Sequence, residues 1–287
     1  GITNATGSCE AVSNVFTVTG HEFQTLSQTV QLHLERDIID NGLPRMFSTN
    51  RSFRRDNKNW VSDGRHLNDF ELLETEALDT DLDWLLKHCA DFLNHIFINV
   101  LNVSSRYGLL TPQLHDNLYN YYEKGFEVVS YTKAVEILQD KFPIEWGDDL
   151  KNEHEQFMVN YFDKNCMITH YPETIKFFNM KIDRSSPDEK QTVECVDVIL
   201  KLSGESIGGS VRESDFELLN KRLQEGTMIS QLRELKNNFD SKPEEVDKMF
   251  DDYLALFRDR KIERSGMGCG FGRVLQFILN SEEIIPF

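Results

Sequence analysis

Arginines beside a carboxylate mark the segment with the richest chemistry, residues 51–76. Arg54 and a second arginine precede Asp56, and Arg65 and His66 follow a polar stretch. A guanidinium presents a planar set of donors that can meet phosphate oxygens in pairs. Apolar residues flank the polar stretch on both sides, which indicates two strands joined by a cationic hairpin loop. Such a hairpin could hold a polyphosphate against a sheet. The alternative is a solvated hairpin whose charges form surface salt bridges.

A pair of carboxylates is the second candidate for chemistry. Asp197 lies in the apolar segment 192–201, which we predict to be a strand, and Glu205 follows just beyond it. Carboxylates near the end of a sheet could hold Mg²⁺ that is bound to phosphates. Most acidic pairs are solvated, so the pattern alone leaves both interpretations open. Arg212 follows residues 208–210 (GGS), a predicted tight turn into a helix over 213–225, and it is a candidate buried cation.

A glycine-rich segment near the end of the chain is the third candidate. Residues 266–273 read GMGCGFGR, and Phe271 stands where a dinucleotide-binding loop needs its third glycine. The glycines would let a flat ligand lie close to the backbone. Arg273 follows at the predicted start of a helix, where an arginine can reach an anion. Close packing of a strand on a helix is the alternative use of such glycines.

The overall charge favours a confined anionic ligand over a long polyanion. The 287 residues include 48 acidic and 31 basic side chains, for a formal net charge of −17. A surface of this sign does not attract nucleic acid non-specifically. Several arginines nevertheless fall between positions 45 and 65. The sequence therefore predicts an acidic body with one basic pocket.

The cysteines and the hydropathy pattern bear on the compartment. Five cysteines occur, an odd number, and no two form a C-x-x-C pair. This usage argues against a zinc site or a disulfide framework and favours a reducing compartment. No apolar run approaches the roughly 20 residues that span a bilayer. We therefore expect a cytoplasmic protein with no membrane partner.

The remaining elements must position these candidates. Apolar residues recur at three- and four-residue intervals over 81–103, which predicts a helix capped by Thr80 or Asp81. Apolar and polar residues alternate in the second half of segment 24–35, which predicts a strand. A short helix is predicted to follow over 37–41. Further strands are predicted over 166–169 and 176–181. No linker or internal repeat divides the chain, so we predict one α+β domain, residues 1–287, with a mainly antiparallel sheet.

Five segments occur in the order found in one enzyme family: RSFRRD…RHLNDFELLETE, WGDDLKNEHE, ITHYPETIKFFNMK, VDVILKLSGESIGGSVRE and SGMGCGFGRVLQ. From about Ser8 to Phe287 the chain resembles the catalytic domain of class II aminoacyl-tRNA synthetases, and within them the asparaginyl-tRNA synthetases. The resemblance implies a mainly antiparallel sheet flanked by helices. It also implies the use of ATP and Mg²⁺.

The resemblance assigns roles to single residues. Arg54 would hold the α-phosphate of ATP and the amino-acid carboxylate, and Arg273 would face adenine and the γ-phosphate; both are expected to be catalytic. Asp197 and Glu205 would carry Mg²⁺. Further ATP-binding residues implied by the family pattern are Asp56, Arg65, His66 near the terminal phosphates, Leu67, Phe70 stacked on adenine, Glu205 and Gly270.

The resemblance also suggests which amino acid is bound. Glu10 would receive the α-ammonium group with help from Gln31. Glu35 and Arg212 match positions that read a side-chain amide. Leu34 stands where the aspartate enzymes have a lysine, so a carboxylate at position 35 would repel aspartate and accept from an amide.

The expected reaction is ATP-dependent activation of asparagine to asparaginyl adenylate, with acyl transfer to the acceptor end of tRNA(Asn). A paralogue that passes the acyl group to ammonia or another amine, as an asparagine synthetase does, is an alternative, and so is a non-catalytic relative. No anticodon-binding domain is expected within the chain, and the acyl acceptor stays open. The first family motif, which builds the homodimer, would lie before Gly1.

Four substitutions depart from the family pattern. Asp56 stands in place of Glu, Gly272 in place of Glu, Ala11 in place of Gly, and Arg264 in place of His. The first two lie in segments expected to bind ATP. They are therefore expected to affect the nucleotide site.

Overall fold

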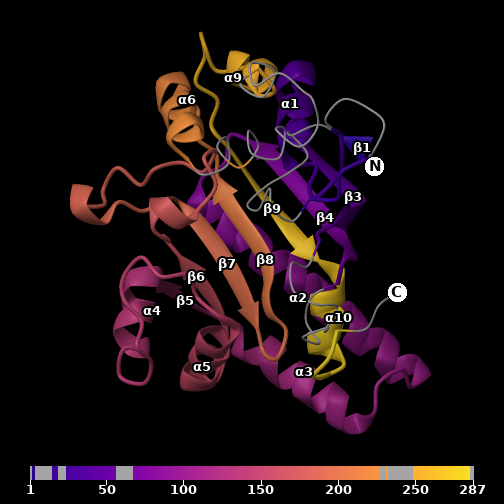
Figure 1. Ribbon diagram of the computed structural model, residues 1–287. Helices are drawn as coiled ribbons and strands as arrows, with labels where there is room; N and C mark the ends of the chain where they lie inside the picture. Colours follow the sequence, from indigo (N-terminus) through magenta and orange to yellow (C-terminus); the bar gives the residue numbers. More distant parts are fainter. Residues whose placement is uncertain are drawn as a thin grey trace.

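The computed structural model describes residues 2–3, 15–18, 24–55, 67–226, 231 and 248–284 (Figure 1). The strands are β1 (Ile2–Thr3), β2 (Thr25–Leu26), β3 (Arg45–Phe53), β4 (Asp69–Leu78), β5 (Phe126–Ser130), β6 (Asn165–Thr169), β7 (Cys195–Leu200), β8 (Gly204–Val211) and β9 (Arg264–Gly270). The helices are α1 (Gln31–Asn41), α2 (Leu82–Tyr107), α3 (Pro112–Lys124), α4 (Tyr131–Leu138), α5 (Asn152–Phe162), α6 (Phe216–Glu225), α9 (Asp251–Ala255) and α10 (Phe271–Ile278), with 3₁₀ turns η3 (Glu173–Ile175) and η4 (Asp188–Lys190).

A seven-stranded sheet organises the molecule, in the order β3-β4-β9-β8-β7-β6-β5. Neighbouring strands run antiparallel except β5 and β6, which are parallel. The predicted α+β architecture with a mainly antiparallel sheet flanked by helices is therefore confirmed.

The two strands of the predicted hairpin are present as β3 and β4. They pair in continuous register from Arg45 opposite Ala77 to Phe53 opposite Asp69. On the exposed side, Arg51 Nε lies 3.1 Å from Asp69 Oδ2. Position 56 and positions 65 and 66, expected to bind ATP, lie outside the described residues.

Helix α2 packs on the sheet through a regular apolar stripe. Its N-cap is Asp81, whose side chain accepts a hydrogen bond of 2.8 Å from the Trp84 amide. Residues at i, i+4 spacing then face the sheet and are almost fully buried: Leu85, Cys89, Leu93, Phe97 and Leu101. Gly108 ends the helix with a left-handed φ of 64°. The predicted helix is confirmed and extends four residues beyond its expected end.

Three hydrophobic clusters join the helices to the sheet. Helices α2, α3 and α10 pack with strands β7, β8 and β9, and α4 and α5 pack around β5, β6 and β7. Helices α1, α6 and α9 share a third cluster and gather at one end of the sheet in Figure 1. Among the described residues, no helix combines the length and apolarity that crossing a membrane requires.

Two predicted strands were wrong, each for a physical reason. The alternating segment before residue 35 belongs to helix α1, where Leu32, Glu35, Ile38 and Ile39 form one buried face. The expected strand over 176–181 is a loop. Its carbonyl groups bond to Arg222, which reaches Phe177, Phe178 and Met180, instead of to a neighbouring strand.

The predicted turn over 208–210 was also wrong. These residues lie within β8, and Gly208 pairs with Gly268 of β9. A methyl group at Gly209 would lie 3.0 Å from the carbonyl oxygen of Gly266, so the strands approach closely there. The glycines of both strands also line the cavity described next.

Candidate active site

One cavity of about 390 Å³ lies against the sheet. Of the predicted site residues that the structure describes, all except Glu35 line it: Gln31, Arg54, Leu67, Phe70, Asp197, Glu205, Arg212, Gly270 and Arg273. These residues come from helices α1 and α10, strands β4, β7, β8 and β9, and adjoining segments. Residues distant in the sequence therefore meet around a space large enough for a small ligand.

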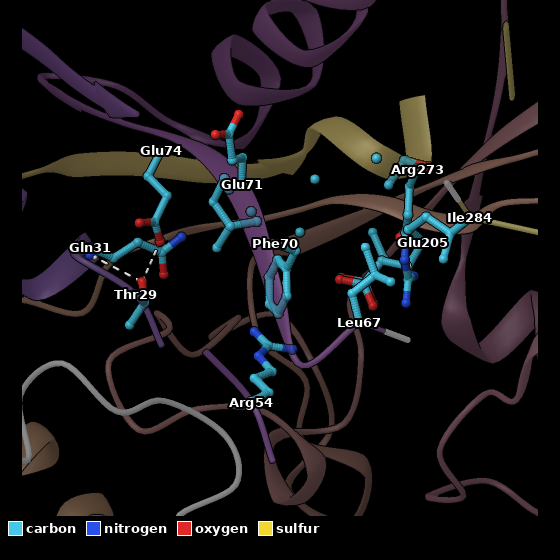
Figure 2. Close-up of a pocket in the computed structure, with 18 of the residues that line it drawn as sticks. Thr29, Gln31, Arg54, Leu67, Phe70, Glu71, Glu74, Glu205, Arg273 and Ile284 are labelled. Atoms are coloured by element: carbon cyan, nitrogen blue, oxygen red, sulfur yellow. Dashed lines mark hydrogen bonds between the residues drawn. The ribbon is translucent and has the colours of Figure 1, made fainter. Parts of the chain in front are cut away.

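The cavity has two chemically different sides, with Phe70 and Arg54 between them (Figure 2). Figure 2 shows Arg273 and Glu205 on one side, and Gln31 and Glu74 on the other. The Arg54 guanidinium carbon lies 5.3 Å from the centre of the Phe70 ring. A cation and an aromatic face thus border the middle of the cavity. This arrangement suits a ligand that has both an anionic group and a flat ring.

On the Arg273 side, two carboxylates converge. A methyl group placed on Gly208 would lie 2.7 Å from Glu205 Oε1 and 3.8 Å from Asp197 Oδ1. Both side chains thus offer hard oxygen atoms around one small space, which fits Mg²⁺ shared with the phosphates of a ligand. Within the described part of the chain, no group of three or more His, Cys, Asp or Glu side chains could hold a metal by itself.

On the other side, Glu74 is nearly fully buried and faces the cavity. Its carboxylate accepts hydrogen bonds from the Thr29 hydroxyl and, at 2.9 Å, from the Val30 amide. Burial raises the pKa of Glu74, although these two donors oppose the rise. Gln31 begins helix α1 beside it and lines the same wall. This wall offers acceptors for a ligand ammonium group.

Arg212 presents a cation from a fully buried position. Its guanidinium donates to both carboxylate oxygens of Glu76, with Nε 3.4 Å and Nη2 2.5 Å away. Nη1 lies 2.9 Å from the Ser210 hydroxyl. Burial alone would lower the pKa of Arg212, but the carboxylates of Glu76 and Glu35 raise it above its ordinary value. The cation is therefore held in one orientation at the cavity wall.

Glu35 does not line the cavity, whereas a direct contact with the side-chain amide of a ligand would require it to do so. It is fully buried, and its carboxylate accepts from Asn179 Nδ2, the Tyr253 hydroxyl and Arg264 Nε, each at 2.8 Å. Arg212 Nε lies 3.7 Å away. Arg212 lines the cavity and Glu35 does not, so in this geometry Glu35 can influence a ligand through Arg212.

Some cavity residues were missed by the sequence analysis, chiefly Glu74 and Lys176. Glu74 could have been found, because strand periodicity places it on the same face of β4 as Phe70. Lys176 had no such signal, since the loop that carries it was predicted as a strand. Position 10, expected to bind the α-ammonium group, lies outside the described residues.

The chain matches the family described as tRNA synthetases class II (D, K and N) over residues 3–286. It is similar to the asparagine–tRNA ligase of Microcystis aeruginosa, with 30% identity over 308 residues, 97% of this chain and 62% of that protein. The corresponding protein of Borrelia garinii subsp. bavariensis is 32% identical, over 91% of this chain and 54% of that protein.

Solved structures agree with this grouping. Asparaginyl-tRNA synthetase from Pyrococcus horikoshii, complexed with asparaginyl-adenylate, gives a TM-score of 0.79 at 30% identity, covering 97% of this chain and 59% of that one. The Entamoeba histolytica asparaginyl-tRNA synthetase shares the fold, with a TM-score of 0.74 at 22% identity. This chain thus spans about three fifths of the length of several relatives. From its sequence match and its fold, the chain belongs to the class II aminoacyl-tRNA synthetases of the aspartate, lysine and asparagine group.

Proposed function

We propose that this chain activates asparagine with ATP to form asparaginyl adenylate, and that tRNA(Asn) receives the acyl group. The observation that carries the proposal is a cavity with a cationic, aromatic centre, a pair of carboxylates on one side and an ammonium-accepting wall on the other. Relatives that cover nearly the whole chain are asparagine–tRNA ligases, and one solved relative holds asparaginyl-adenylate.

In the proposed reaction, an oxygen of the asparagine carboxylate attacks the α-phosphorus of ATP. A new oxygen–phosphorus bond forms, the bond from the α-phosphorus to the bridging oxygen breaks, and pyrophosphate leaves with the electron pair. No covalent bond to the enzyme is needed. The protein contributes by holding both reactants in line and by stabilising the charge that develops on the phosphate.

The proposed roles follow from the lining of the cavity. Arg54 neutralises charge on the α-phosphate, and Phe70 supplies an aromatic face for adenine. Arg273 binds at the nucleotide end. Its guanidinium already donates to the carbonyl oxygen of Glu205, which fixes its direction. Together these residues place the phosphate chain along the side of the cavity that carries the carboxylates.

The opposite wall is proposed to bind the amino acid. Gln31 and Glu74 offer oxygen acceptors for its ammonium group, and Arg212 donates to the oxygen of its side-chain amide. Asp197 and Glu205 would hold Mg²⁺, which supplies positive charge to the phosphates when it is bound.

The test is ATP–pyrophosphate exchange with asparagine, aspartate or lysine as the amino acid. We expect exchange with asparagine and little with the other two. Arg54→Ala should lower the exchange rate by about 100-fold or more, as loss of a charge-stabilising donor does. Arg51→Ala is the matched control, because this side chain pairs with Asp69 on the exposed side of the same hairpin.

The acceptor is tested in the same system by adding tRNA(Asn), ammonia or small amines. Charging of tRNA supports the proposal. Exchange with asparagine but no charging would assign the adenylate to another acceptor. Absence of exchange with every amino acid at saturating ATP and Mg²⁺, or unchanged exchange in Arg54→Ala, would contradict the proposed site.

A further inference from the structure

A lysine without an assigned role lies among the carboxylates of the cavity. Lys176 follows the 3₁₀ turn Glu173–Ile175, and its ammonium nitrogen lies 2.6 Å from Asp197 Oδ2. The same nitrogen lies 4.1 Å from the centre of the buried Tyr171 ring. Only 13% of the Lys176 side chain and 9% of the Asp197 side chain are exposed. The pair is therefore a nearly buried part of the cavity wall.

One more carboxylate, Glu205, faces the same space, and the charge of Lys176 also acts on Asp149. Glu205 converges with Asp197 on the space beside Gly208. Burial raises the pKa of Asp149, the charge of Lys176 lowers it, and the charge of Glu205 raises it, so Asp149 lies within the electrostatic reach of both. Lys176 thus contacts one of the two carboxylates that converge on this space. A divalent cation held there would need the same Asp197 carboxylate.

The ammonium group and a divalent cation would compete for the same ligand. An oxygen that accepts a short, charged hydrogen bond from Lys176 is less available to coordinate a metal. A lysine ammonium is a compact charge on a flexible stem, so it can leave one anion and contact another. A nucleotide bound on this side of the cavity would offer its phosphate chain as such an anion.

We propose that Lys176 is a positioning residue that occupies Asp197 until a divalent cation binds, and that it then turns to the nucleotide phosphates. Before metal binding, Lys176 holds the Asp197 carboxylate in one orientation. Afterwards, its charge is added to those of Arg54 and Arg273 around the phosphates. The inference rests on the proposed function only in taking the anionic ligand to be a nucleoside triphosphate.

The test compares wild type with Lys176→Met and Lys176→Arg in two titrations. The first measures Mn²⁺ binding by electron paramagnetic resonance without nucleotide, because Mn²⁺ uses the same oxygen ligands as Mg²⁺. The second measures ATP binding by calorimetry in the presence of a chelator. Lys181→Met is the control: it removes a lysine that pairs with Glu194 at 3.2 Å outside the cavity lining.

The two titrations should move in opposite directions. In Lys176→Met, Mn²⁺ should bind about tenfold more tightly and metal-free ATP about tenfold more weakly, the size of one lost charge interaction. Lys176→Arg and Lys181→Met should both stay near wild type. If Lys176→Met does not fold by circular dichroism, Lys176→Gln replaces it.

Unchanged or weaker Mn²⁺ binding in the neutral variant would overturn the proposal, and so would unchanged ATP binding. Neither titration contains an amino acid, so each is independent of asparagine activation. Normal ATP–pyrophosphate exchange with asparagine, together with Mn²⁺ binding that is not tighter in Lys176→Met, would reject this inference alone. Tighter Mn²⁺ binding and weaker ATP binding in Lys176→Met, without exchange for any amino acid, would reject the proposed function alone.

Discussion

Removing the charge of Arg264 tests the buried network behind the cavity. Arg264 is completely buried, and its Nε and Nη2 lie 2.8 Å and 2.7 Å from Glu35 Oε2. Nη2 also donates to the carbonyl oxygen of Glu213 at 3.1 Å. Arg264→Met keeps a side chain of similar reach and removes every donor. Glu35 would then keep the bonds from Tyr253 and Asn179 but lose its closest cation.

The size of the effect follows from burial. An ionised carboxylate left without its partner in a protein interior costs about 3–5 kcal/mol. Small domains are stable by only about 5–15 kcal/mol, so this is a large part of the total. For a chain of this size the melting temperature should fall by roughly 6–20 °C. Glu35→Leu should cost a similar amount, because it leaves Arg264 unpaired.

The assay is urea unfolding of both single variants and of the double variant Glu35→Leu/Arg264→Met. The double variant buries no unpaired charge from this pair, so its loss should be smaller than the sum of the single losses by about 2–3 kcal/mol. Arg36→Met is the control on the same helix. That side chain is half exposed beside Asp40, and its loss should cost less than about 1 kcal/mol.

Additive losses would refute the reasoning, because they would mean that Glu35 and Arg264 do not depend on each other. Glu35→Gln gives a second, functional arm. If Glu35 contacted asparagine directly, this variant would raise the KM for asparagine and leave stability unchanged. The geometry predicts mainly a loss of stability.

Three further predictions concern the cavity and the sheet beneath it. Phe70→Ala should weaken ATP binding by about 1–3 kcal/mol through lost stacking on the base and leave the KM for asparagine unchanged. Equal effects on the KM for ATP and the KM for asparagine would argue against stacking of Phe70 on adenine. Burial raises the pKa of Glu74. The folded protein therefore keeps the proton of the Glu74 carboxyl group at pH values where the unfolded chain has lost it. As a result, the unfolding free energy falls as pH rises above the ordinary glutamic-acid pKa. Glu74→Gln should flatten that slope in urea unfolding measured between about pH 5 and 8, and an unchanged slope would contradict the assignment. Gly266→Ala would place a methyl group against the carboxylate of Glu76 and should cost about 1–3 kcal/mol in urea unfolding. The methyl group of Gly270→Ala would have no atom nearer than 3.9 Å, so this variant should cost less. Equal losses would contradict the predicted crowding at Gly266.

The sequence predicts those parts of the fold where local pattern and packing agree. Helix α2 repeats its apolar residues over several turns and carries a capping Asp81, so both its type and its start were predicted correctly. The strands of the hairpin around Arg54 were recognised from their apolar and polar alternation. Both elements depend mainly on residues close in the chain.

The errors occur where distant contacts decide the structure. The local pattern predicts a turn at the glycines of β8, yet Gly209 lies in a strand that another strand approaches closely. Residues 176–181 form a loop because Arg222, far along the chain, binds their carbonyl groups. No local pattern contains this information.

The candidate site shows the same division. Arg54, Asp197 and Arg273, which the family resemblance assigned to the ATP and Mg²⁺ site, line one cavity. The resemblance assigned Glu35 to the ligand, but Arg264 holds that carboxylate inside the protein. It also missed Lys176, whose importance comes from the folded cluster of charges and not from its neighbours in the sequence.

The most direct test of the central claim is binding of a non-hydrolysable asparaginyl-adenylate analogue, measured by calorimetry beside the matching aspartyl analogue. An adenylate unites both reactants, so it should use both sides of the cavity and bind far more tightly than ATP or asparagine alone. We predict tight binding of the asparaginyl analogue, weaker binding of the aspartyl analogue, and a loss of about 100-fold in Arg54→Ala. Failure of the asparaginyl analogue to bind more tightly than ATP would contradict the assignment of this cavity to adenylate formation.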